Sequence, residues 1–309
     1  MEIPVLFCID GNFWQHLGVT IVSMLRSNPE NTFRIILVSA AEMDPARLAE
    51  LRSVVGDGGS TLEAIVYKGA AEYEHLPTHD HLTFAMYLRL FMTEYLDPAL
   101  DRIIYLDSDL IVRGDLSQLW RMDLQSAYVG GVPEPYSETQ RKPFGFGPQD
   151  LYVNSGVLLI DLERWRRDNL LAAFVKFAIA NQERLRSPDQ DILNSVCRGR
   201  VLNIGFEWNW QALFPRFAPE ELGLTAEKYA ELRERANIVH YTSRYKPWFY
   251  RWEPHYKELY YEALAGTPWE GYAPPDRSLG NLPVKAAKAL QRKLEWYLPG
   301  VARKLRGIS

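Results

Sequence analysis

The chain has 309 residues, of which 47% are hydrophobic and 24% charged, and its formal net charge is −4. This composition is typical of a globular protein with enough length for a sizeable core. The slightly acidic balance gives no indication of a nucleic-acid partner. Two cysteines in a chain of this length do not form a disulfide framework, so we expect a reducing compartment.

The predicted elements of the first part of the chain alternate between strands and helices. In chain order they are a strand over 5–9, a helix over 13–27, a strand over 33–38, a helix over 44–55 and a strand over 62–67. This alternation predicts an α/β protein with a parallel, doubly wound sheet and a nucleotide site at the carboxyl ends of its strands. The Gly-x-Gly-x-x-Gly fingerprint of dinucleotide-binding proteins does not follow the first strand.

The elements of the second part are less regular in their order. They are a helix over 83–95, strands over 103–106, 128–132 and 156–162, and helices over 164–184, from 187 onward and over 219–235. The apolar stretch over 5–9 is too short for the core of a signal peptide, and no predicted helix is long and apolar enough for a membrane span. We therefore expect a cytoplasmic protein.

An acidic triplet, Asp107-Ser108-Asp109, follows the buried strand that ends at Leu106. If the strand continues, Asp107 and Asp109 project to the same side, where the two carboxylates repel each other unless a cation lies between them. Divalent cations such as Mg²⁺ and Mn²⁺ prefer oxygen ligands of this kind. The pattern is short, and a strand end followed by a turn is the alternative interpretation.

Six segments, taken together and in order, resemble the motifs of glycosyltransferase family eight, the retaining sugar-nucleotide transferases. They are Phe7-Cys-Ile-Asp-Gly-Asn-Phe13, Tyr87-Leu-Arg-Leu90, Leu106-Asp-Ser-Asp-Leu-Ile-Val112, Tyr152-Val-Asn-Ser-Gly-Val-Leu-Leu-Ile160, Asp189-Gln-Asp-Ile-Leu-Asn194 and His240-Tyr-Thr-Ser-Arg-Tyr-Lys-Pro-Trp248. The resemblance spans roughly residues 3 to 250 and is greatest to bacterial lipopolysaccharide galactosyl- and glucosyltransferases. It implies a Rossmann-like nucleotide-binding domain with a mostly parallel mixed sheet, of the glycosyltransferase A type.

The resemblance also implies the substrates and the metal. The donor is UDP-galactose or UDP-glucose, the acceptor is a glycan or glycolipid hydroxyl, and the metal is Mn²⁺ or Mg²⁺. The implied metal ligands are Asp107, Asp109 and His240. The implied donor-binding residues are Asp10 and Asn12 for the uracil and ribose, Lys246 for a phosphate, and Ser108, Arg89, Asn154, Ser155 and Asp189 for the rest of the donor.

Gln190 matches the family position that faces the anomeric carbon, which implies retention of configuration. An amide is a poor nucleophile, so we favour a front-face substitution in which Gln190 orients the sugar and stabilises positive charge, with Asp189, Arg89 and Lys246 as the other catalytic residues. A double displacement through Asp189 or Asp191 is the alternative. His81 and Glu134 match positions that line the acceptor side in related enzymes.

The carboxyl terminus differs from the rest of the chain in its charge. Residues 283–309 hold seven basic side chains and one acidic one, interleaved with apolar residues at helical spacing. A basic amphipathic helix of this kind suits an anionic membrane surface, and packing on the catalytic domain is the alternative. We therefore divide the chain into a catalytic domain (1–265), a linker (266–282) and a small helical tail (283–309) that associates peripherally with the inner face of the cytoplasmic membrane.

Two other functions compete with transfer. A nucleotidyltransferase that makes the sugar nucleotide usually carries a Gly-rich, basic loop near its amino terminus, and this chain lacks one. A catalytically silent UDP-sugar-binding protein would keep the fold but lose the acidic pair, Gln190 or Lys246. These residues are all present, so the sequence favours an active enzyme.

Overall fold

The computed structural model describes the whole chain except residues 12, 74–75, 77–83, 135–137 and 299–309. The chain divides into two compact units. Unit 1 consists of Met1–Leu17, Asn28–Ser108 and Asp115–Gly205, and unit 2 consists of Gly18–Ser27, Asp109–Gly114 and Phe206–Ser309. The chain thus passes from one unit to the other inside the acidic triplet. The predicted domain limits at residues 265 and 282 stay a prediction.

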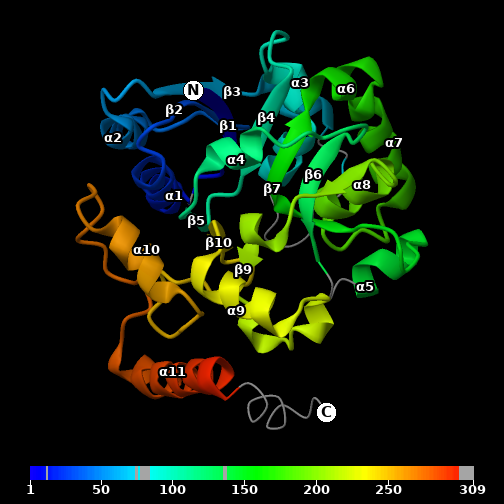
Figure 1. Cartoon of the computed structure of the whole chain (residues 1–309). Helices are drawn as coiled ribbons and strands as arrows, with labels where there is room; N and C mark the ends of the chain where they lie inside the picture. The colour runs from blue at the N-terminus through cyan, green and yellow to red at the C-terminus, as the bar shows by residue number, and fades with distance from the viewer. Residues whose placement is uncertain (12, 74–75, 77–83, 135–137, 299–309) are drawn as a thin grey trace. The chain divides into compact units, whose positions relative to one another are not determined.

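Unit 1 is built on a seven-stranded sheet (Figure 1). Its strands are β1 (Glu2–Cys8), β2 (Thr32–Ser39), β3 (Thr61–Val66), β4 (Arg102–Leu106), β6 (Val129–Pro133), β7 (Val153–Asp161) and β8 (Val201–Asn203). They lie in the order β3-β2-β1-β4-β7-β6-β8, and only β7 runs antiparallel to its neighbours. The mostly parallel mixed sheet that the sequence predicts is therefore confirmed.

Helices and short 3-10 turns connect the strands of unit 1. They are α1 (Trp14–Ser27, whose residues from Gly18 belong to unit 2), α2 (Pro45–Val55), η1 (Lys68–Tyr73), η2 (Phe84–Leu90), α3 (Met92–Tyr95), α4 (Leu116–Trp120), α5 (Glu138–Arg141), η3 (Lys142–Phe144), α6 (Leu162–Arg167), α7 (Leu170–Asn181) and α8 (Pro188–Val196). One continuous apolar core lies between the sheet and these helices. Helix α8 packs against β7 and η2, and hydrogen bonds join its first turn to Asn154 and Ser155 at the start of β7.

Two predicted helices of unit 1 are interrupted. The described part of the segment 83–95 is the 3-10 helix η2 followed by the four-residue helix α3, and most of the residues of η2 are buried. The segment 164–184 breaks at Asn169, whose backbone is left-handed with φ 49°. Asparagine tolerates this conformation better than most residues, so the chain turns there and starts α7 as a separate helix.

Unit 2 contains a small three-stranded sheet and three longer helices. Its elements are β5 (Leu110–Val112), η4 (Phe206–Trp208), β9 (Trp210–Gln211), η5 (Phe214–Arg216), η6 (Glu220–Leu222), α9 (Ala226–Arg235), β10 (Ile238–His240), α10 (Lys257–Leu264), η7 (Leu279–Asn281) and α11 (Leu282–Tyr297). The predicted helix over 219–235 is divided at Gly223, whose left-handed φ of 68° ends η6. Within the sheet, β10 pairs antiparallel with β5 and parallel with β9.

The carboxyl-terminal helix α11 packs on unit 2 through one face. Glu295 is 4% exposed and accepts hydrogen bonds from Arg216 and Gln291, and Trp296 packs against Tyr256 and under the guanidinium of Arg233. The predicted helical tail is therefore confirmed as a helix. Among the described helices, none is long and apolar enough to cross a membrane.

Candidate functional site

The acidic triplet does not lie on a strand, contrary to the alternation argument above. β4 ends at Leu106 and β5 begins at Leu110, and the residues between them form a bend. The chain bends here because β4 belongs to the sheet of unit 1 and β5 to the sheet of unit 2. Ser108 is buried, whereas Asp107 and Asp109 are partly exposed.

In unit 1, Arg89 forms ion pairs with carboxylates from two segments that are far apart in the sequence. Its guanidinium lies 3.0 Å from the carboxylate of Asp107 and 3.2 Å from that of Asp189. It also donates to the carbonyl and hydroxyl oxygens of Ser155 at 3.1 and 3.3 Å, and it lies over the ring of Tyr105. The Tyr105 hydroxyl donates to Asp107 at 2.6 Å, and the Ser155 hydroxyl donates to Asp189 at 2.8 Å. The cluster therefore holds two carboxylates on one buried cation.

Electrostatics keep this arginine charged. Burial lowers the pKa of Arg89, but Asp107, Tyr105 and Asp189 outweigh burial and raise that pKa well above its ordinary value. A guanidinium with planar, fixed donors is suited to holding carboxylates or hydroxyls in a defined orientation. Four elements thus contribute to one rigid polar cluster. They supply Arg89 from η2, Tyr105 from β4, Ser155 from β7 and Asp189 from α8.

Gln190 lies next to this cluster, near the start of α8. Both the nitrogen and the oxygen of its side-chain amide form hydrogen bonds. Its amide nitrogen donates to the carboxylate of Glu134 at 2.5 Å. Its amide oxygen accepts from the side chain of Asn154 and the backbone N–H of Ser155, each at 3.2 Å. Because an ionised carboxylate only accepts and a backbone N–H only donates, the orientation of the amide is fixed.

Asp191 is fully buried and its oxygens are occupied. It accepts from the Tyr152 hydroxyl at 2.5 Å and from the backbone N–H groups of Arg186 and Ser187 at 2.7 and 2.9 Å. These contacts give it a structural role at the start of α8. Burial raises its pKa, while Tyr152 and the two backbone groups lower it less, so the net direction is upward.

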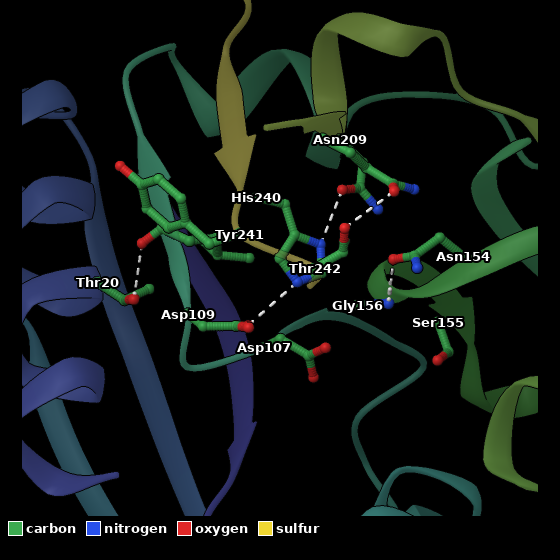
Figure 2. Close-up of polar contacts among 12 residues, drawn as sticks. Thr20, Asp107, Asp109, Asn154, Ser155, Gly156, Asn209, His240, Tyr241 and Thr242 are labelled. Atoms are coloured by element: carbon green, nitrogen blue, oxygen red, sulfur yellow. Dashed lines mark hydrogen bonds and ion pairs between the residues drawn. The ribbon is translucent and has the colours of Figure 1, made fainter. Parts of the chain in front are cut away.

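In unit 2, Asp109 lies beside two potential cations. Figure 2 shows Asp109, His240 and Asn209 as a chain of contacts, in which Asp109 is 3.1 Å from Nε2 of His240 and Asn209 is 3.0 Å from Nδ1. Lys246 is ion-paired with Asp109 and donates to the Tyr241 carbonyl at 2.6 Å. Burial raises the pKa of Asp109, but Lys246 and His240 together lower that pKa far below its usual range.

The strand pairing of unit 2 explains this proximity. His240 is the last residue of β10 and pairs with Leu110, the first residue of β5. The backbone N–H of Tyr241 donates to the carbonyl of Asp109 at 3.0 Å, which extends the pairing by one residue. The register of a short antiparallel pair therefore brings together two side chains that are 131 positions apart.

Not every predicted residue falls in these clusters. Asp10 follows β1 and is partly exposed, and Asn12 and His81 lie outside the described residues. Neither Tyr105 nor Asn209 could be predicted, because a tyrosine inside an apolar strand and an asparagine between two tryptophans belong to no motif. Tyr105 contacts the predicted residues Asp107 and Arg89, and Asn209 contacts the predicted residue His240.

Comparison with known proteins now identifies the family. A family model described as glycosyl transferase family 8 matches residues 4–251. The chain belongs to this family. It is a glycosyltransferase, as the motif set predicts. Among curated relatives of this family 8 chain, the lipopolysaccharide 1,2-glucosyltransferase of Escherichia coli K12 is 28% identical over 88% of this chain and 80% of that protein.

A second relative and a solved structure are also similar to this family 8 chain. General stress protein A of Bacillus subtilis is 27% identical over 88% of this chain and 96% of that protein. A crystal structure of the galactosyltransferase LgtC with donor and acceptor sugar analogs superimposes with a TM-score of 0.74 at 24% identity, covering 87% of this chain and 99% of that one. The glycosyltransferase A type of fold is therefore confirmed.

Proposed function

We propose that this chain is a retaining, metal-dependent hexosyltransferase that moves galactose or glucose from a UDP-sugar to a hydroxyl of a glycan or glycolipid. The family match supports glycosyl transfer over the synthesis of a sugar nucleotide. The names of two relatives, a lipopolysaccharide glucosyltransferase and a galactosyltransferase, support a hexose donor and a role in making lipopolysaccharide or another surface polysaccharide.

The pairing of Asp109 with His240 is the observation that carries the metal assignment. In the tautomer in which Nδ1 of His240 donates to the Asn209 oxygen, Nε2 and the Asp109 carboxylate 3.1 Å away are both acceptors, and a divalent ion would satisfy both. Asp107 is two residues from Asp109, within about 7 Å along the backbone. Two carboxylates and an imidazole fit Mn²⁺, with Mg²⁺ as the alternative. When bound, the ion would neutralise charge on the diphosphate leaving group.

We assign donor binding to three groups of residues. Asp10 and Asn12 would bind the uracil and ribose, and Lys246 a phosphate oxygen. The remaining donor contacts would come from Ser108, Arg89, Asn154, Ser155 and Asp189. The ion pairs and hydrogen bonds of Arg89 support this role, because they fix polar groups at the carboxyl end of β4 and the start of β7.

Gln190 would act on the anomeric carbon from its fixed position. Its amide oxygen carries partial negative charge and would stabilise positive charge that develops on the sugar. The buried contacts of Asp191 argue against that residue as a nucleophile. The front-face mechanism is therefore preferred, with Asp189, Arg89 and Lys246 as the other catalytic residues, and double displacement through Asp189 is the second candidate.

We place the protein in the cytoplasm, attached peripherally to an anionic membrane surface. α11 packs on the rest of unit 2 through Glu295 and Trp296. Its exposed large apolar side chains are Leu282, Val284, Leu290 and Tyr297, and Leu298 directly after the helix is also exposed. Residues 283–309 also carry seven basic side chains against one acidic one. An exposed apolar face with surrounding positive charge suits the boundary between lipid headgroups and acyl chains.

The function is tested by incubating the full chain with Mn²⁺ and a panel of sugar nucleotides, and measuring release of nucleoside diphosphate. We expect release from UDP-galactose or UDP-glucose, abolished by chelator and restored by Mn²⁺. The Asp107→Ala/Asp109→Ala double variant should be inactive but folded, and Asp57→Ala, which changes an exposed aspartate, should be fully active. Release of inorganic diphosphate instead would favour a nucleotidyltransferase, and UDP-sugar binding without release would favour a binding protein.

A further inference from the structure

Asn209 is a buried amide in unit 2 that none of the six sequence motifs includes. It lies between Trp208 and Trp210, directly before β9, and its side chain is 0% exposed. Both tryptophans are buried as well, and the indole N–H of Trp210 donates to the Tyr256 hydroxyl at 2.7 Å. Because a buried amide is costly unless it forms hydrogen bonds, the partner of Asn209 indicates the role of this position.

The pairing of β9 with β10 brings Asn209 to His240. The two strands run parallel, with Gln211 opposite His240. Since side chains alternate along a strand, Asn209 and Gln211 project to the same side as His240. The amide oxygen of Asn209 lies 3.0 Å from Nδ1 of His240 (Figure 2). The small sheet of unit 2 therefore fixes an asparagine outside the motifs against a proposed metal ligand.

The buried His240 ring has a contact at each of its two nitrogens. Nδ1 lies against the Asn209 oxygen, and Nε2 lies 3.1 Å from the carboxylate of Asp109. An amide oxygen only accepts hydrogen bonds, so this contact places the proton of the neutral ring on Nδ1 and leaves the lone pair of Nε2 on the side of Asp109. The hydrogen bond at one ring nitrogen decides which nitrogen serves as a metal ligand. Asn209 therefore selects Nε2, the nitrogen beside the carboxylate.

We propose that Asn209 is a positioning residue that makes the metal site selective for Mn²⁺ over Mg²⁺. This proposal rests on the proposed function, because it takes Asp107, Asp109 and His240 as the ligands. The two carboxylates suit both ions. Imidazole is a ligand of transition-metal ions, whereas Mg²⁺ prefers carboxylates and water, so His240 is the ligand of these three that discriminates. Asn209 acts through His240, because it holds the ring with Nε2 as the ligand atom.

The test measures binding of Mn²⁺ and Mg²⁺ to the full chain without sugar nucleotide. Free Mn²⁺ is followed by its EPR signal, and Mg²⁺ by competition with Mn²⁺. We expect wild type to prefer Mn²⁺, and Asn209→Leu to weaken Mn²⁺ binding about 10-fold to 100-fold and Mg²⁺ binding by much less. Asn209→Asp keeps an oxygen acceptor at Nδ1, so it should retain most of the Mn²⁺ affinity. Asn181→Leu, which removes an amide that donates to the Phe177 carbonyl at 2.9 Å at the end of α7, is the matched control and should bind both ions as wild type does.

Equal Mn²⁺ affinity of wild type and Asn209→Leu would overturn the proposal. An equal loss of Mn²⁺ and Mg²⁺ binding would also overturn it, because that pattern indicates general damage to the site. Thermal unfolding followed by tryptophan fluorescence checks that each variant is folded, and Asn209→Ala takes the place of Asn209→Leu if the leucine variant does not fold. If wild type binds Mn²⁺ with the expected selectivity but releases no nucleotide from any sugar nucleotide, the proposed transfer is refuted and the role of Asn209 is retained.

Discussion

At the scale of single residues, the two polar clusters differ in what holds them together. Arg89 is a buried cation that two carboxylates surround, so its cluster is a structural unit without any further ion. Asp109 contacts His240 and Lys246, and Asn209 lies on the far side of the imidazole ring, so an oxygen and a nitrogen ligand lie side by side. This difference is why we propose Asp109 and His240 as metal ligands and the Arg89 cluster for sugar recognition, with Asp107 as the residue that the two groups share.

The contact between Glu134 and Gln190 leads to a prediction about turnover. Glu134→Gln replaces a charged group that only accepts with a neutral one that also donates, so the Gln190 amide keeps its contacts with Asn154 and Ser155 but is held less firmly at its nitrogen. We expect kcat to fall about 10-fold to 100-fold with little change in the KM for the donor, and Glu134→Asp to recover part of the loss. Steady-state kinetics of nucleotide release measure both constants.

The matched control for this prediction is Glu138→Gln, an exposed glutamate on α5, which should behave as wild type. Gln190→Ala supplies the reference, because removal of one electrostatic contact typically costs on the order of 100-fold to 1,000-fold in rate. If Glu134→Gln raised only the KM for the acceptor, its role would be in acceptor binding and not in positioning Gln190.

At the scale of elements, the sequence predicts strands better than it predicts bends. β2, β4 and β6 lie within one residue of their predicted positions and β1 begins three residues before its predicted start, because buried β-branched runs are a strong local signal. The bend at the acidic triplet has no such signal, since the switch from one sheet to another depends on the pairing of β5 with a strand far along the chain. The same limitation applies to Asn209, whose partner His240 is 31 residues away.

The exposed face of α11 gives a prediction about membrane binding. Leu290 and Tyr297 are 60% and 74% exposed, so Leu290→Glu/Tyr297→Glu should leave the fold intact. We expect this variant to lose cosedimentation with anionic vesicles at low salt, because it removes apolar contact and adds negative charge. Ile179→Glu, which changes an exposed apolar residue on α7, is the control.

Point substitutions are preferable to deletion of residues 283–309 for this purpose. Deletion removes Glu295 and Trp296, which pack on unit 2, and so tests stability as well as membrane binding. Vesicle binding by Leu290→Glu/Tyr297→Glu at the wild-type level would eliminate the membrane role of this face. In that case the packing of α11 on unit 2 would be its only assigned function.

The buried pair of Glu295 and His255 predicts how stability depends on pH. Burial raises the pKa of Glu295, but the hydrogen bond from His255 and the charge of Arg216 outweigh burial and lower that pKa to about 2. Burial lowers the pKa of His255, so the folded state holds it neutral. Stability from Glu295 is complete above its unfolded pKa and is lost as pH falls toward 2. His255 also destabilises the fold as pH falls below its unfolded value.

The thermal midpoint of unfolding, followed by tryptophan fluorescence, should therefore fall as the pH is lowered from about 7 to about 3. Glu295→Gln should have a lower midpoint at neutral pH and a weaker pH dependence in the acid range. Glu220→Gln, at an exposed glutamate, should follow the wild type. An identical acid dependence in wild type and Glu295→Gln would mean that other carboxylates determine it.

At the scale of the whole molecule, the chain has a family 8 fold, for which we propose a metal held by Asp107, Asp109 and His240 and an amide, Gln190, at the reacting carbon. Fold and family follow from the sequence, because six separated motifs share one order and residues 4–251 match the family. The identity of the donor and the stereochemistry depend on contacts with molecules that are not part of the chain. One reaction followed over time tests these together.

The most direct measurement is proton NMR of slow UDP-sugar hydrolysis, which needs no acceptor. The full chain is incubated with UDP-α-galactose or UDP-α-glucose, with Mn²⁺ or with chelator, and the released hexose is observed before its anomers interconvert. We predict that the α-anomer appears first, that UDP forms at the same rate, and that both signals disappear in chelator. First release of the β-anomer, or equal release in chelator, would contradict a retaining, metal-dependent transferase.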